Sequence, residues 1–283
     1  MSAETEPGRR RLVNLAYRLL GSLAEAEDAV QETYARWYDL SPGDRDAITS
    51  PEAWLTTVAS RICLDVLRSA RVRRESYVGE WLPEPLPSDD GTDDPADRVT
   101  LDESVSMAFL VVLETMTPAE RVAFVLHDVF RYSFAEVAEI TGRTPAACRQ
   151  LASSARRRVR DSRNPPSPGQ ATLVSDFRRA LEAGDVRALI GLLDPEATIT
   201  ADGGGLVPAA PRPVTGADRI ARFLVGQRVG ARPILERPVN GQPGLVSVED
   251  GTAVTVFAFA VDGMRITRIW AMRNPEKLRP WNP

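Results

Sequence analysis

Residues 134–160 read FAEVAEITGRTPAACRQLASSARRRVR, which is the pattern of two helices joined by a tight turn. Gly142 supplies a turn residue that tolerates a positive φ, and Thr144 and Pro145 follow in the order of a helix cap and a first helical residue. On the second helix, apolar side chains fall on one face, and polar and basic side chains fall on another, at Arg149, Ser153, Arg156 and Arg160. A helix with one buried face and one Arg-bearing face suits the major groove, so the stretch predicts a DNA-binding helix-turn-helix.

The region before this motif is also helical by its apolar spacing and its caps. The pattern predicts a first helix that ends at Gly21 and a second that starts at the Ser22–Glu25 capping box and runs to about Trp37. A loop is expected over 39–49, followed by a long helix that starts at Pro51 and ends in a basic run. The N-terminal part is therefore predicted to be all-α.

Charge is distributed unevenly along the chain, although the net charge is only −4. Residues 80–104 carry nine acidic side chains and one Arg, whereas residues 145–163 carry six Arg and one Asp. A basic stripe beside an acidic run indicates nucleic acid more strongly than the charge of the whole chain. Residues 83–97, rich in Pro and Asp, and residues 163–170 have no periodic pattern and are predicted to be irregular linkers.

Composition excludes several classes of protein. No apolar run approaches the ~18 residues that are needed to span a bilayer. The N-terminus lacks the apolar region of a signal peptide. Cys63 and Cys148 are the only thiols, which excludes a disulfide framework and a zinc-ligand spacing. A cytoplasmic protein without a metal site is expected.

The last part of the chain differs in kind from the helical parts. One amphipathic helix is predicted over about 171–183, followed by strand patterns at 197–202, 252–261 and 264–272 with glycine-containing turns between them. This order predicts an α+β domain with a curved antiparallel sheet. Three acidic residues are candidates for acid–base chemistry, although the first and last precede glycines and are more typical of turns: Asp202, Asp218 and Asp262.

Three segments, in this order and at this spacing, resemble a known family. They are LGSLAEAEDAVQETYARW at 20–37, SPEAWLTTVASRICLDVLRS at 50–69, and the helix-turn-helix stretch, and they resemble the extracytoplasmic-function (ECF) sigma factors, which are bacterial transcription initiation subunits. Three shorter motifs are similar to those of the subgroup with a fused SnoaL-like domain, a cone-shaped relative of the nuclear-transport-factor-2 fold: YVGEWLPEP at 77–85, DGGG at 202–205 and NPEKL at 274–278.

The resemblance implies a multidomain fold of two all-α DNA-binding domains, the second a helix-turn-helix, followed by a cone-shaped α+β SnoaL-like domain. Residues 1–80 would bind core RNA polymerase and the promoter −10 element, and residues 105–162 would bind the −35 element. Residues 81–104 would form an acidic, Pro-rich linker between them. Residues 171–283 would form the SnoaL-like domain that regulates the activity of the sigma factor. The expected partners are core RNA polymerase, through its β′ clamp helices and β subunit, promoter DNA, and a small-molecule ligand of the C-terminal domain. No cofactor, enzyme activity or membrane contact is expected.

The resemblance also implies site residues. Contact with the polymerase clamp helices falls on Asp28, Gln31 and Glu32. Binding on the −10 side falls on Arg61, Arg68, Arg71, Arg73 and Arg74, and binding on the −35 side falls on Arg149, Ser153, Arg156 and Arg157. Interdomain contacts fall on Trp81, Pro83, Asp202, Gly203, Gly204, Gly205, Asn274, Pro275, Glu276, Lys277 and Leu278, with Glu276 and Lys277 expected to point outward.

Two other functions remain open at this point. One is a SnoaL-like enzyme of the cyclase or isomerase type tethered to a DNA-binding module, and the other is a helix-turn-helix regulator that senses a ligand. The acidic helix around Asp28 favours the sigma factor, because neither alternative needs a surface that docks on polymerase. The sequence departs from the family at Ser154, where Arg is usual, and at Leu206, where Lys usually follows DGGG.

Overall fold

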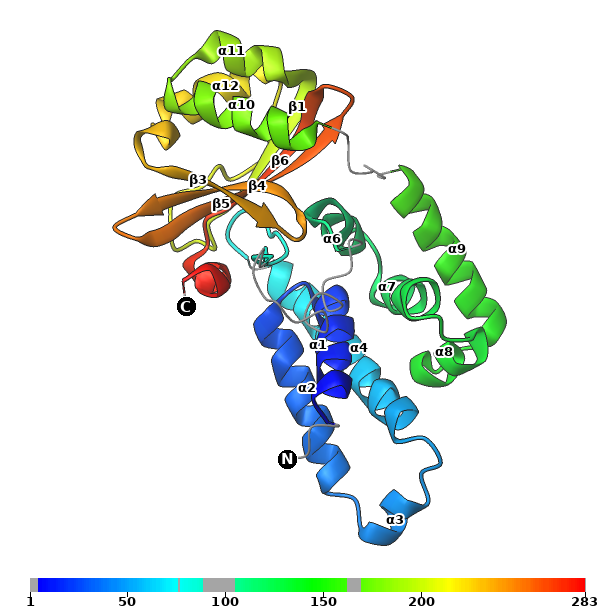
Figure 1. Ribbon diagram of the computed structural model, residues 1–283. Helices are drawn as coiled ribbons and strands as arrows, with labels where there is room; N and C mark the ends of the chain where they lie inside the picture. Colours follow the sequence, from blue (N-terminus) through cyan, green and yellow to red (C-terminus); the bar gives the residue numbers. More distant parts are fainter. Residues whose placement is uncertain (1–4, 76, 89–104, 162–168, 283) are drawn as a thin grey trace. The chain divides into compact units, whose positions relative to one another are not determined.

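The computed structural model describes residues 5–75, 77–88, 105–161 and 169–282, which form two compact units (Figure 1). The first unit combines the chain up to Glu75 with residues Val112–Ser162, and the second combines Ser76–Val111 with Arg163–Pro283. None of the helices in the described part of the chain has the length and apolar character needed to cross a membrane.

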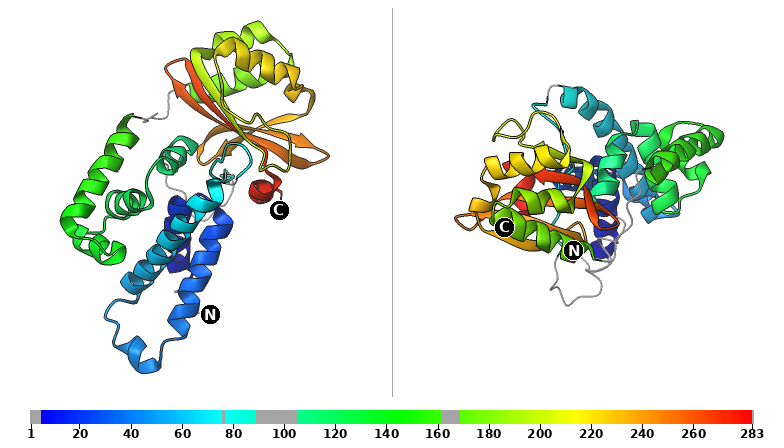
Figure 2. Two further views of the ribbon diagram at one scale, coloured as in Figure 1. Left: turned by 180° about the vertical axis from the view of Figure 1, so that it is seen from behind. Right: turned by 90° about the horizontal axis from the view of Figure 1, so that it is seen from above.

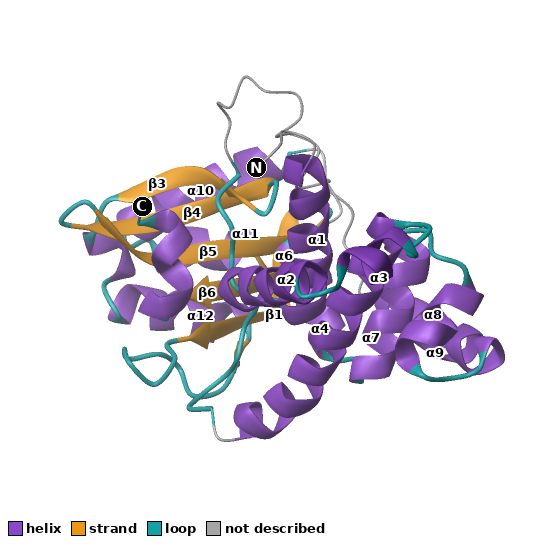
Figure 3. Ribbon diagram, turned by 90° about the horizontal axis from the view of Figure 1, so that it is seen from below, coloured by secondary structure: helices purple, strands orange, loops and turns teal. Residues whose placement is uncertain are grey.

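The first unit is entirely helical where it is described. Its elements are α1 (Thr5–Leu20), α2 (Leu23–Tyr38), α3 (Pro42–Asp46), α4 (Pro51–Glu75), α7 (Pro118–Phe124), a π-helical turn (Val125–Val129), α8 (Phe134–Thr141) and α9 (Pro145–Asp161). Helix α6 (Met107–Glu114) precedes α7 and crosses the boundary between the units. Helices α1, α2 and α4 pack together, and their side-by-side arrangement is visible in Figure 3.

The predicted caps of the first helices are confirmed. Gly21 adopts φ 73° and its N–H donates to Tyr17 O at 2.8 Å, which ends α1. The Ser22 hydroxyl then accepts from the Glu25 N–H at 3.4 Å and starts α2. The segment 39–49, which was expected to be a loop, instead contains the short helix α3, whose N-cap is Ser41. This helix lies between the ends of α2 and α4 (Figure 2).

The predicted helix-turn-helix is confirmed. Ser133 and Glu136 form a reciprocal capping box at the start of α8, and Gly142 ends it in the left-handed conformation with φ 66°. Helix α9 then starts at Pro145 and buries one face through Cys148, Ala152 and Ala155. In α7 the buried Arg121 donates to Leu19 O at 2.8 Å and pairs with Glu114 at 2.7 Å. The hydrogen bond to Leu19 ties α7 to α1 within one unit.

The second unit is built on one six-stranded sheet in the order β2-β1-β6-β5-β4-β3, part of which is visible in Figure 3. The strands are β1 (Leu193–Asp202), β2 (Val214–Thr215), β3 (Ile234–Val239), β4 (Gln242–Glu249), β5 (Thr252–Asp262) and β6 (Arg265–Met272). The expectation of an antiparallel sheet is wrong for one pair, because β1 and β6 run parallel. The chain leaves β1 for β2, a helix and the β3–β5 meander, and β6 returns beside β1 in the same direction.

Each face of this sheet carries a separate apolar core. Helices α10 (Gln170–Glu182), α11 (Val186–Leu192) and α12 (Ala217–Gly226) cover one face, where Phe177 meets Phe259 at a ring distance of 5.3 Å (Figure 1). The other face packs against Leu82, Met107 and Leu278, which belong to the segment before α6, to α6, and to the 3-10 helix η3 (Pro275–Trp281). Residues 77–88, called the linker segment below, are thus part of the C-terminal domain's core.

Candidate functional site

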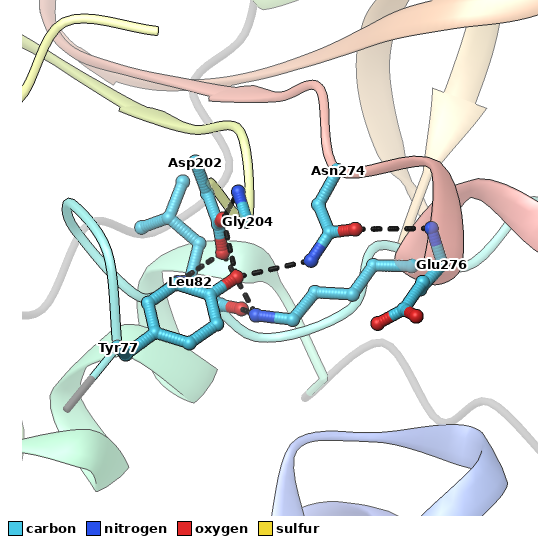
Figure 4. Close-up of polar contacts among 7 residues, drawn as sticks. Tyr77, Leu82, Asp202, Gly204, Asn274 and Glu276 are labelled. Atoms are coloured by element: carbon cyan, nitrogen blue, oxygen red, sulfur yellow. Dashed lines mark hydrogen bonds and ion pairs between the residues drawn. The ribbon is translucent and has the colours of Figure 1, made fainter. Parts of the chain in front are cut away.

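One buried carboxylate joins the linker segment to the C-terminal domain. Asp202, at the end of β1, is 0% exposed and accepts four hydrogen bonds (Figure 4). Two donors come from the linker segment, the Tyr77 hydroxyl at 2.7 Å and the Leu82 N–H at 2.9 Å. The others are the Lys277 ammonium at 2.8 Å and the Gly204 N–H at 2.9 Å. These donors compensate the cost of burying the charge, which is otherwise prohibitive.

Lys277, the only lysine of the chain, supplies the countercharge. Its Nζ also donates to Leu82 O at 2.6 Å and lies 4.0 Å from the centre of the Trp81 ring, where the ring quadrupole attracts a cation. The expectation that this side chain points outward is therefore wrong. Within η3, Glu276 is exposed as expected, whereas Lys277 and Leu278 turn inward onto the linker segment and the sheet.

Asn274 fixes the start of η3 and also contacts the linker segment. Its side-chain oxygen accepts from the Glu276 N–H at 3.0 Å, and its Nδ2 donates to the Tyr77 hydroxyl at 3.0 Å (Figure 4). Burial, with Asp202 next to it, raises the pKa of Tyr77 well above its ordinary value. The phenol therefore stays protonated and remains a donor to Asp202 at neutral pH.

The glycines after Asp202 are required by close contacts. Gly204 adopts φ 64°, and a Cβ added there would lie 2.4 Å from the Asn274 amide nitrogen. Gly205 adopts φ 72°, and its Cβ would lie 2.9 Å from Val78 of the linker segment. At Gly203 a Cβ would meet the Val207 carbonyl oxygen at 2.3 Å. The backbone can follow this path only without side chains.

The linker segment has further contacts that the sequence did not indicate. The Trp281 indole donates to Pro85 O at 2.7 Å, and the Asn240 side chain accepts from the Leu86 N–H at 3.1 Å. In the sequence, Asn240 is recognisable only as the first residue of an Asn-Gly turn, with no sign of a contact with residues 77–88. Pro83 and its neighbours are buried. We call Tyr77, Trp81, Asp202, Asn274 and Lys277 the linker-binding cluster.

Acid–base chemistry has little support among the three acidic candidates. Asp202 is fully occupied by its four donors, and Asp218 forms an exposed pair with Arg222 at 2.9 Å on α12. Asp262 is exposed at the turn after β5, next to Gly263 with φ 57°.

Helix α2 presents its predicted docking residues on one side. Asp28, Gln31 and Glu32 are all exposed, at the i, i+3 and i+4 positions that share a helix face. The opposite side buries Ala26, Ala29, Val30 and Thr33 against the neighbouring helices. Glu32 is ion-paired with Arg36 one turn later.

The residues predicted for the −10 side lie along α4. Arg61 is exposed and donates to Glu139 O of α8 at 3.0 Å. Arg68 is exposed and pairs with Asp65 at 3.1 Å. Arg71, Arg73 and Arg74 belong to the last turns of α4, but their side chains lie outside the described residues.

The residues predicted for the −35 side separate into two groups. Arg149, Ser153 and Arg157 are exposed on α9, with the Arg149 guanidinium 5.6 Å from the centre of the Phe134 ring. Arg156 is instead half-buried and pairs with Asp128 at 2.6 Å. It therefore holds α9 against the π-helical turn in the free protein.

Ser154, where the family usually has Arg, faces the interior of the unit. Its hydroxyl donates to Glu120 Oε1 at 2.8 Å, and Glu120 also caps α7 through the Thr117 N–H at 2.9 Å. Burial acts to raise the pKa of Glu120, but these hydrogen bonds and the nearby Arg158 outweigh it and lower that pKa below its ordinary value. The serine thus supports the packing of α7 on α9.

Comparison with known proteins gives two family matches, Sigma-70 region 2 over residues 6–73 and Sigma-70, region 4 over residues 106–159. The ECF RNA polymerase sigma factor SigJ of Mycobacterium tuberculosis is 42% identical over 97% of this chain and 92% of its own length. The probable ECF RNA polymerase sigma factor SigI of the same species is 36% identical over 99% of this chain and 95% of its own.

A solved structure extends the similarity to the whole fold. The crystal structure of M. tuberculosis SigJ matches with a TM-score of 0.80 at 39% identity, covering 98% of both chains. The predicted order of two helical sigma domains followed by an α+β domain is thus confirmed. The chain belongs to the ECF RNA polymerase sigma factors, and it is a transcription initiation factor rather than an enzyme.

Proposed function

We propose that the C-terminal domain regulates this sigma factor by holding the linker segment. The main support for this proposal is the buried Asp202 carboxylate, which accepts hydrogen bonds from Tyr77 and Leu82 of the linker segment and forms an ion pair with Lys277 of η3. In sigma factors the connector between the two DNA-binding domains threads toward the polymerase active-site cleft. A connector bound by the C-terminal domain is not free to follow that path, so retention and release of the linker segment set activity.

The proposed polymerase-docking surface is the exposed side of α2. Asp28, Gln31 and Glu32 lie together there and expose no apolar area in the free protein, which suits a surface that is used only transiently. Their proposed partner is the pair of clamp helices in the β′ subunit. Transcription takes place in the cytoplasm, which is the proposed location.

The proposed DNA contacts use the arginines of α4 and α9. On the −10 side, Arg61 and Arg68 are exposed and suited to neutralising backbone phosphates, with Arg71, Arg73 and Arg74 continuing along the same helix. Arg61 would first have to leave the Glu139 carbonyl. This contact favours a closed arrangement within the first unit before polymerase binds.

On the −35 side, Arg149, Ser153 and Arg157 are the proposed direct contacts, because they are exposed on α9. Arg156 is proposed to position α9 through Asp128. Replacing Arg149 by Ala should weaken binding to −35 duplex by about 1–3 kcal/mol if it contacts a base, whereas a phosphate contact would lower affinity evenly across sequences. Unchanged affinity and selectivity would contradict the assignment.

The regulatory proposal is tested by run-off transcription with core polymerase and the full-length chain. Lys277→Met removes the countercharge of Asp202, and Glu276→Gln, at an exposed neighbour, is the matched control. We expect the first variant to change transcript yield at equal polymerase binding and the second to match the parent. Equal yields from all three proteins, with the linker segment shown to be released, would contradict the proposal.

A further inference from the structure

A cavity of about 440 Å³ lies inside the C-terminal domain, between the helical face of the sheet and α12. Its wall includes Ile199, Ala201, Phe257 and Ala271 from the strands and Leu224 from α12, all of them buried. This volume is within the ~300–1,000 Å³ typical of sites for small molecules, which are mainly apolar with a few polar groups. The interior is therefore suited to an apolar molecular body.

Two guanidinium groups, two hydroxyls and the side-chain amide of Gln227 form the polar part of the wall. Arg232 and Arg273 line the cavity together with Ser247 and Thr255, and none of the described residues that line it is acidic. Burial lowers the pKa of Arg273, and the positive charge of Arg232 lowers it further. The two cations are thus close enough to repel each other.

The countercharge at this wall is incomplete. The buried Nε of Arg232 lies 3.1 Å from a Glu249 carboxylate oxygen, which is ion-pair distance, but it forms no hydrogen bond within the described structure. Arg273 donates to the carbonyl of Pro208, and no carboxylate of a described residue is within ion-pair distance of it. Because one carboxylate faces two guanidinium groups, the wall carries an excess positive charge that favours the binding of an additional anion.

We propose that this cavity binds an organic acid, with the apolar body inside and the carboxylate on Arg273 and Arg232. Guanidinium groups recognise carboxylates through paired N–H donors, whereas the apolar wall accepts no second charge. The ligand class is therefore a monocarboxylic acid with an aromatic or aliphatic body.

The cavity and the linker-binding cluster share two short pieces of chain. Ala201 lines the cavity and Asp202 follows it, while Arg273 lines the cavity and Asn274 follows it. The N–H groups of Arg273 and Asn274 both donate to Asp202 O, at 2.7 and 2.9 Å. An acid bound to Arg273 consequently biases the retention of the linker segment, a step that rests on the proposed regulatory function.

The test uses the full-length chain and two probes of one shape, naphthalene-2-carboxylate and its neutral carboxamide, in isothermal titration calorimetry. We expect the acid to bind roughly 10-fold or more tightly than the amide, because charged hydrogen bonds are worth factors of this size. Arg273→Met, and separately Arg232→Met, should weaken acid binding by a similar factor and leave amide binding unchanged. Arg219→Met, at an exposed arginine of α12 outside this cavity, is the matched control.

Equal affinity for the two probes, acid binding that survives both substitutions, or no binding of either probe would overturn the proposal. Thermal unfolding of each variant identifies a loss of fold, and the second arginine variant then decides. Run-off transcription with the acid separates this proposal from the regulatory one. Acid binding without an effect on transcription contradicts only the regulation, and a transcription change in Lys277→Met without acid binding contradicts only the site.

Discussion

Replacing Lys277 by Met is expected to release the linker segment. The substitution keeps most of the side-chain length but leaves the fully buried Asp202 carboxylate without its countercharge. Removing one partner of a buried ion pair costs about 3–5 kcal/mol. The hydrogen bond from Nζ to Leu82 O at 2.6 Å is lost as well. The change with the lowest free-energy cost is detachment of residues 77–88 from the sheet, which lets water reach the Asp202 carboxylate.

Hydrogen exchange at one amide reports this release directly. The Leu82 N–H donates to Asp202 at 2.9 Å, so its exchange requires that the linker segment opens. A loss of about 3–5 kcal/mol corresponds to exchange that is faster by about two to four powers of ten. Amides of β5, in the centre of the sheet, serve as the internal reference for global unfolding.

A double-mutant cycle with Asp202→Asn isolates the pair from other effects of each substitution. Each single variant leaves one buried charge alone, whereas the double variant leaves none, so it should be less destabilised than the sum by about 1–3 kcal/mol. Glu276→Gln should leave exchange at Leu82 unchanged because its side chain is exposed. Parent-like exchange at Leu82 in Lys277→Met, or strictly additive effects, would refute the reasoning.

Three further outcomes are expected. Asp28→Ala with Gln31→Ala should lower co-purification with core polymerase without changing the thermal unfolding of the first unit, and normal co-purification would count against the docking surface. The pKa of Glu120 is lowered in the folded state, so the stability that its carboxylate contributes is present above about pH 4.5, the ordinary pKa of a glutamate, and is lost as the pH falls. Glu120→Gln should therefore flatten that part of the pH dependence of the melting temperature. Gly204→Ala should lower the melting temperature of the C-terminal domain, because its Cβ would meet Asn274 at 2.4 Å and φ is 64°; an unchanged melting temperature would refute the steric argument.

The helical part of the fold was predictable because its signals are local. Gly21, Ser22, Gly142 and Pro145 each mark a helix boundary through their own backbone or side-chain chemistry, and each boundary is where the sequence placed it. The parallel pairing of β1 with β6 was not predictable in this way. It joins segments about seventy residues apart, and a strand's own alternation does not specify its neighbour's direction.

The candidate site was predictable as motifs but not as an arrangement. Asp202–Gly205 and Asn274–Leu278 were identified as contact residues, but the direction of Lys277 depends on η3, whose start is capped by Asn274. Tyr77 was part of a quoted motif without a role of its own. Its role as a donor becomes visible only when Asp202 is placed 2.7 Å away from it.

The identity of residue 277 follows from the geometry of the site. The chain has 35 Lys and Arg residues, and Lys277 is the only lysine among them. Its ammonium reaches Leu82 O and Asp202 Oδ2 at 2.6 and 2.8 Å while it lies 4.0 Å from the Trp81 ring centre. A compact cation with three donors in different directions fits these contacts, whereas a planar guanidinium presents its donors in one plane and needs more room. In a protein that otherwise uses arginine for its positive charge, a lysine at this position is best explained by the closed space around Asp202.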